Sequence, residues 1–111
     1  MHEENQLEIY RLQADLCKAL ADPKRLRIIR ELRNQERTVS ELVEILGLKQ
    51  SNTSQHLGVL RRINLVAFRK SGSTVYYRLA NPKIGDACDM VHQVIADQLQ
   101  STRDLAKIIN R

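Results

Sequence analysis

Residues 48–64 read LKQSNTSQHLGVLRRIN, and the rest of the fold is organised around the helix that they predict. Ser51 is a favourable N-cap residue and predicts the start of a helix over about 51–63. Residues suited to burial recur at helical spacing on one side of this helix: Thr53, Leu57, Leu60 and Ile63. A helix with one such face packs that face on a core and turns the other face outward.

The outward face of this predicted helix carries short polar side chains and ends in two arginines. We expect DNA contacts from nine residues of the segment: Lys49, Gln50, Ser51, Asn52, Ser54, Gln55, His56, Arg61 and Arg62. Hydroxyl and amide groups hydrogen-bond to base edges in a DNA major groove, and arginines bind its phosphates. The alternative is an ordinary solvated helix face, or, for His56, packing at the rim beside Leu60. The rest of the sequence favours DNA.

Charge is distributed unevenly along the chain, although the formal net charge is only +5. From Lys49 to Ala80 the chain has six basic residues and no acidic residue, while the other segments contain all 13 acids. A solvated surface does not explain this exclusion of acids. An acid-free basic segment predicts a surface that binds a polyanion such as nucleic acid.

Length and composition indicate a single domain over residues 1–111 with an aliphatic core, because aromatic residues make up only 4% of the chain. No apolar run approaches the ~20 residues that span a bilayer. The start MHEENQLEIYR lacks the basic and then apolar pattern of a secretory signal. We therefore expect a cytoplasmic protein that does not bind membranes.

Two helices are predicted upstream. A helix over about 5–21 carries two apolar stripes, and because the domain's core needs only one, the second should meet another surface. Asp22-Pro23 predicts the start of the next helix, since proline in a first turn lacks only an N–H that would be unpaired there. That helix is expected to bury a set of aliphatic residues: Leu26, Ile28 or Ile29, and Leu32.

A third helix leads into the turn of a predicted helix-turn-helix. Ser40 is expected to cap this helix, and Gly47 to end it in a left-handed conformation. Residues 48–50 then have the length of a turn between two crossing helices. Thr38-Val39, just before the helix, is expected to form a short edge strand.

After Asn64 the sequence period changes from that of a helix to that of a strand. Two strand-like runs over about 65–79 flank Ser71-Gly72-Ser73, which predicts a β-hairpin. A hairpin that follows a recognition helix is a wing. We expect its basic and hydroxyl side chains to reach the phosphate backbone or the minor groove: Arg69, Lys70, Ser71 and Ser73.

The last predicted helix covers about 82–109. At 1.5 Å per residue it would be roughly 42 Å long, whereas a compact chain of this length has a radius of gyration near ~13 Å. The helix should therefore overhang the domain. A second copy best buries its apolar face together with the spare stripe of the helix over 5–21, and a two-fold dimer suits a palindromic DNA site.

Three separated motifs carry a family resemblance: KALADPKRLRIIRELR, TVSELVEILGLKQSNTSQHLGVLRRINLV and GSTVYYRLANP. In this order they resemble the ArsR/SmtB family of winged-helix repressors over nearly the whole chain. The resemblance implies a mainly α winged helix-turn-helix with a small β-hairpin, dimerising through its first and last helices. It also implies a double-stranded DNA operator as partner, base contacts from residues 50–56, a wing over 69–73, and release of the operator when an inducer binds.

The metal sites of that family are matched poorly. Residues 39–43 read VSELV, so the Cys-x-Cys motif of the third helix is absent. On the last helix Asp89 and His92 share a face, yet two ligands make a weak metal site unless the partner subunit adds more. No cofactor is therefore certain.

Two cysteines, Cys17 and Cys88, lie on the apolar stripes that we assign to the dimer seam. One interpretation is that each is a small buried hydrophobic residue. The other is that the pair senses a thiophilic metal ion, oxidation or persulfide formation, which would need only their proximity. The sequence leaves both open.

The leading hypothesis is a homodimeric, sequence-specific transcriptional repressor that an inducer releases, with a thiol, reactive-sulfur or soft-metal signal among the candidates. The alternative is a winged-helix protein-interaction module that binds no operator. The polar face of residues 50–62 argues against that, because a protein interface favours aromatic or aliphatic anchors. We expect no enzyme, since no nucleophile pairs with a base and no glycine-rich phosphate loop is present.

Overall fold

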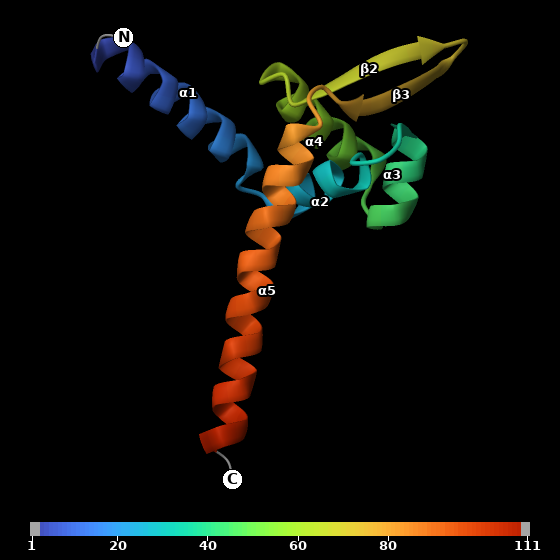
Figure 1. The fold of residues 1–111 in the computed structure, drawn as a ribbon. Helices are drawn as coiled ribbons and strands as arrows, with labels where there is room; N and C mark the ends of the chain where they lie inside the picture. The colour runs from blue at the N-terminus through green and yellow to red at the C-terminus, as the bar shows by residue number, and fades with distance from the viewer. Residues whose placement is uncertain (1–2, 110–111) are drawn as a thin grey trace.

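The computed structural model describes residues 3–109 and confirms the predicted fold class, a mainly helical winged helix-turn-helix (Figure 1). The elements in chain order are α1 (Glu3–Leu20), α2 (Pro23–Glu31), β1 (Arg37–Thr38), α3 (Val39–Leu46), α4 (Gln50–Arg62), β2 (Val66–Ser71), β3 (Thr74–Leu79) and α5 (Lys83–Ile109). α3 and α4 form the helix-turn-helix, and β2 and β3 form the wing.

The core is aliphatic, as predicted, and lies between α2, α3, α4 and the base of the wing. Its main members are Ile28, Ile29, Leu32, Leu42, Leu57, Leu60, Leu65, Val66 and Leu79. The face of α4 predicted for burial is confirmed: Thr53, Leu57 and Leu60 are buried, and Ile63 packs against the core. The Oγ1 of Thr53 donates to the carbonyl of Lys49 at 3.1 Å, so the one buried polar side chain of α4 has a partner.

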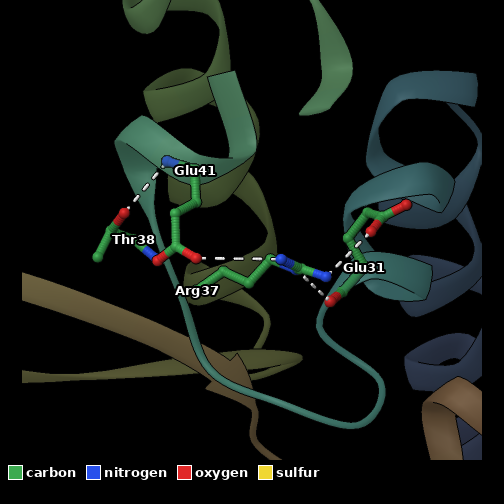
Figure 2. A network of polar contacts seen from close by, with 4 residues as sticks. All are labelled: Glu31, Arg37, Thr38 and Glu41. Carbon is green, nitrogen blue, oxygen red and sulfur yellow. Dashed lines mark hydrogen bonds and ion pairs between the residues drawn. The ribbon is translucent and has the colours of Figure 1, made fainter. Parts of the chain in front are cut away.

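Two expected helix caps are each wrong by two residues. α3 begins after Thr38 rather than Ser40: Thr38 Oγ1 accepts from the N–H of Glu41, whose carboxylate accepts from the N–H of Thr38 (Figure 2). This reciprocal pair satisfies two backbone donors, which a single cap at Ser40 would not. α4 begins after Lys49 rather than Ser51, without a side-chain cap.

Arg37 joins the end of α2 to the start of α3. Its Nε donates to the carbonyl oxygen of Glu31 at 2.9 Å, and its guanidinium also faces the carboxylates of Glu31 and Glu41 at 3.5 and 4.0 Å (Figure 2). This contact set fixes the loop before α3.

The two strands of the wing belong to a three-stranded antiparallel sheet in the order β1-β3-β2. The expected edge strand therefore exists, but it covers Arg37–Thr38 rather than Thr38-Val39. Ser71 pairs with Thr74, so Gly72 and Ser73 form a two-residue turn. Gly72 has φ +63°, which an L side chain rarely adopts.

α1 and α5 project from the rest of the molecule (Figure 1). The radius of gyration is 17.6 Å and the extents are 61 × 47 × 22 Å, against ~13 Å for a compact domain of this length. α1 reaches the core only near its end, through buried Ala19 and half-buried Leu16 and Leu20. Within residues 3–109 no helix is long and apolar enough to cross a bilayer.

Leu26 was expected to be buried, and this is wrong, because its side chain is 42% exposed. The helical turn of α2 places Ile28 and Ile29 together on the core, which leaves Leu26 facing the space beside α1 and α5.

α5 is anchored to α2 by charge and by close approach. Arg33 forms ion pairs with Asp86 and Asp89. Gly85 is buried at the crossing, where an added Cβ would lie 2.7 Å from Arg33 Cγ and 3.1 Å from Leu79 Cδ1. A side chain at this position would push α5 away from the domain.

Candidate nucleic-acid interface

The polar face of α4 is presented outward, opposite the core. Among the nine residues expected to contact DNA from this segment, Asn52 and His56 are half-buried and the other seven are exposed: Lys49, Gln50, Ser51, Ser54, Gln55, Arg61 and Arg62. We call these nine residues the reading face. The face offers amide and hydroxyl groups towards its start and guanidinium groups at its end, which suits base edges and phosphates respectively.

The end of α4 is tied to the wing by a cation–π contact. The Arg61 guanidinium carbon lies 4.2 Å from the centre of the Phe68 ring. The Phe68 ring in turn packs on Tyr77 of β3, with ring centres 5.8 Å apart. This contact orients one of the two arginines while leaving it exposed.

The predicted wing residues are all exposed, but Arg69 already has a carboxylate partner. Its Nε donates to Glu36 at 2.8 Å, and this hydrogen bond raises the pKa of the guanidinium. Arg69 also lies 4.5 Å from the Tyr76 ring centre. Glu36 lies outside the acid-free segment, so sequence reasoning did not place it here. A phosphate at Arg69 must displace this carboxylate, whereas Lys70 forms no ion pair with the residues that the structure describes.

A hollow of about 610 Å³ lies beside the reading face. Ser54, His56 and Arg62 line it from α4, and Arg25 lines it from α2. No local pattern in the sequence connects Arg25 to α4.

A second hollow of about 720 Å³ lies between α1, α2 and α5. We call it the helix groove. Cys17 and Cys88 both line it, with Cys17 exposed and Cys88 half-buried. Burial and, secondly, the nearby Cys17 thiol raise the pKa of Cys88.

Asp89 and His92 also line the helix groove, but each faces an arginine, Arg33 just after α2 and Arg30 within it. Asp89 pairs with Arg33, and His92 Nε2 accepts from Arg30 Nη1 at 3.3 Å. Within the described residues no group of three or more His, Cys, Asp or Glu could hold a metal ion. The two residues therefore do not fit a metal ion as they stand, and we derive no function through one.

Comparison with known proteins identifies the family of this chain. Residues 22–67 match the sequence profile of the bacterial regulatory proteins of the arsR family. The HTH-type transcriptional regulator Rv0081 of Mycobacterium tuberculosis is 42% identical over 89 residues, which cover 79% of this chain and 78% of that protein. The chain belongs to the ArsR family. The transcriptional activator HlyU of Vibrio cholerae is similar to this ArsR-family chain as well, with 40% identity over 71% of the chain and 73% of HlyU.

Solved structures agree with the family assignment. The crystal structure of Rv0081 superposes on this ArsR-family chain with a TM-score of 0.76 and 40% identity, covering 85% of this chain and 95% of that one. The homodimeric winged helix-turn-helix domain Mb0332 of Mycobacterium bovis, solved by NMR, gives a TM-score of 0.81 at 27% identity, covering 90% and 93%. The ArsR-family chain is thus a winged helix-turn-helix transcriptional regulator and not an enzyme.

Proposed function

We propose that this ArsR-family regulator acts in the cytoplasm as a homodimeric repressor that binds a palindromic operator. Two copies of the reading face enter successive major grooves, and the wings contact the flanking backbone. The observation that carries the proposal is the reading face: an acid-free set of exposed amide, hydroxyl and guanidinium groups on a helix whose other side is fixed in the core. Lys49, Ser51 and Asn52 lie at its start, where a recognition helix meets base edges.

The apolar surface supports the dimer. Every exposed large hydrophobic residue in the described part of the chain lies on α1, α2 or α5: Leu7, Ile9, Tyr10, Leu12, Leu26, Met90, Val91, Val94, Ile95, Leu99, Leu105, Ile108 and Ile109. Monomers rarely expose large apolar surfaces, so this many exposed hydrophobic side chains on three helices indicates a partner. A second copy related by a two-fold axis would cover it and leave both reading faces free.

The polar character of the reading face argues against the competing function, a protein-interaction module that would use this face to bind a protein. Large apolar anchors are confined to the helices away from α4 and the wing tip. A protein partner at the reading face would therefore find no hydrophobic hot spot there.

Operator binding is tested by titrating the full chain against DNA from upstream of its own gene and against a scrambled duplex of equal length. We expect the upstream DNA to bind at least a hundredfold more tightly at 150 mM salt, since specific sites exceed non-specific DNA by about 10³ or more. Gln55→Ala should narrow that ratio by about tenfold, because a base contact is worth ~1–3 kcal/mol. Equal affinity for both duplexes would contradict sequence-specific binding.

We further propose that the signal is oxidation of the thiols in the helix groove. Cys17 is exposed enough to react with a peroxide as its thiolate, which gives a sulfenic acid and releases the alcohol or water. The Cys88 thiol then attacks that sulfur, a second water leaves, and a disulfide joins α1 to α5. Because α1 and α5 set how two copies sit together, this bond would change the spacing of the reading faces.

The expected result of peroxide treatment is at least a tenfold loss of operator affinity, reversed by dithiothreitol. Cys17→Ser and Cys88→Ser should each abolish the response while leaving the reduced protein's affinity unchanged. Operator titrations of the three proteins, with and without peroxide, measure this. A wild-type protein whose affinity ignores peroxide would show that both cysteines serve only in packing.

A further inference from the structure

Arg25 of α2 lies outside the helix-turn-helix and the wing, yet its guanidinium is held from two sides. Its Nε donates to the carbonyl oxygen of Ala19, in the last turn of α1, at 2.5 Å. Its Nη1 lies 3.4 Å from Nδ1 of His56 on α4. Since a guanidinium can only donate, this contact requires the His56 tautomer in which Nδ1 is unprotonated. The side chain is therefore fixed in direction before any ligand arrives.

The charge of Arg25 is not paired with a carboxylate. Arg33, Arg37 and Arg69 all form ion pairs, whereas Arg25 forms none among residues 3–109. Asp22 is the neighbouring acid, but its Oδ1 accepts the backbone N–H groups of Lys24 and Arg25 at 2.8 and 3.2 Å. Burial opposes these two bonds, which nonetheless lower the pKa of the Asp22 carboxyl. Asp22 thus acts as the cap of α2. Its charge also acts on the Arg25 guanidinium, but the two groups form no ion pair, so this guanidinium can still bind an external anion.

The space in front of Arg25 is the hollow of about 610 Å³ beside the reading face. Arg25 forms one wall, and Ser54, His56 and Arg62 of α4 form others. Two guanidinium groups and a hydroxyl thus converge on one open concavity, which adjoins the exposed Gln55. Guanidinium groups bind phosphate oxygens through two parallel hydrogen bonds, so this donor set suits a phosphodiester.

We infer that Arg25, together with Arg62, binds a phosphate of the DNA backbone in this hollow, next to the bases that Ser54 and Gln55 face. The inference rests on the proposed operator binding and adds α2 to the surface that holds DNA. Arg25 is a positioning contact: it fixes the register of α4 on the duplex and carries no base preference of its own. The Ala19 carbonyl and His56 supply the orientation, because they hold Nε and Nη1 and leave the N–H groups of Nη2 for the phosphate.

The test compares Arg25→Gln with Arg27→Gln. Both residues lie on α2 and both substitutions remove one positive charge, but the Arg27 side chain is exposed and makes no hydrogen bond or ion pair in the described part of the chain. Operator affinity is measured from 50 to 200 mM salt for wild type and both variants.

We expect Arg25→Gln to weaken binding to operator and to scrambled DNA alike by tenfold or more. We also expect the slope of log affinity against log salt to become shallower by about 2 per dimer, since each lost phosphate contact contributes ~0.9. Arg27→Gln should leave the slope unchanged.

The salt slope separates a phosphate contact from a structural role. An affinity loss with an unchanged slope would mean that Arg25 only supports α4 and would overturn the inference, as would equal behaviour of the two variants.

If Arg25→Gln fails to fold, Arg25→Lys replaces it. Lysine keeps the charge but cannot bridge the Ala19 carbonyl and a phosphate, so we expect a severalfold loss, and wild-type affinity would overturn the inference. If the affinity of the wild-type protein depended on neither the DNA sequence nor the salt concentration, the proposed function itself would be refuted.

Discussion

Operator affinity is expected to fall by about a thousandfold when salt rises from 50 to 200 mM. Binding of a basic protein releases the cations condensed on DNA, so log affinity falls with log salt at about 0.9 per neutralised phosphate. Three phosphate contacts per protomer, from basic residues such as Arg25, Arg62 and Lys70, would make six per dimer. The slope of log affinity against log salt would then be about −5. A fourfold rise in salt then lowers affinity by roughly 10³. Titrations at five or more salt concentrations measure the slope.

A pair of lysine variants provides the control for that slope. Lys70→Ala removes a positive charge from the wing. Lys107→Ala removes one near the end of α5, which lies far from α4 (Figure 1). We expect the first to reduce the slope by about 2 per dimer and the second to leave it unchanged. A slope near zero for wild type, or equal effects of the two variants, would contradict DNA binding through this surface.

Leu42→Ala is expected to destabilise the domain by about 3 kcal/mol, the largest effect on folding that we predict. Leu42 is 0% exposed and is the one residue of α3 that is fully buried in the core. Truncating it removes apolar contacts and leaves a cavity, which costs ~2–5 kcal/mol for a buried leucine. Because α3 supports α4, operator binding should be lost at temperatures where the variant unfolds. Urea unfolding measures the free energy.

Leu46→Ala is the matched control, since Leu46 lies one turn later on α3 and packs only at the edge of the core. We expect a loss of about 1 kcal/mol, because a half-buried side chain returns less apolar area to water. The proteins should be compared at one concentration, as the stability of a dimer depends on it. Equal losses for the two variants would show that α3 does not pack through Leu42.

Several features of the chain were predictable because they depend on local sequence. The apolar period of α4 gave its buried face, Asp22-Pro23 gave the start of α2, and the change of period after Asn64 gave the wing. Gly47 has φ +66°, as expected for the residue that ends α3 in a left-handed conformation, and Asn64 after α4 has φ +63°. Capping was less predictable, since Thr38 and Ser40 are both good caps and only the reciprocal bond with Glu41 favours Thr38.

Local sequence was therefore enough to predict the order of helices and strands, the aliphatic core and the polar reading face, because periodicity and capping act within one or two turns. Which charges remain available to DNA depends instead on how the helices and strands pack. Folding brings Glu36 against Arg69 across 33 positions and Arg25 against His56 across 31. The wing thus loses a free cation that the acid-free segment seemed to provide, and α2 supplies one that no local pattern indicated. Such contacts depend on how separate elements pack, because charges interact over distances in space that their separation along the chain does not determine.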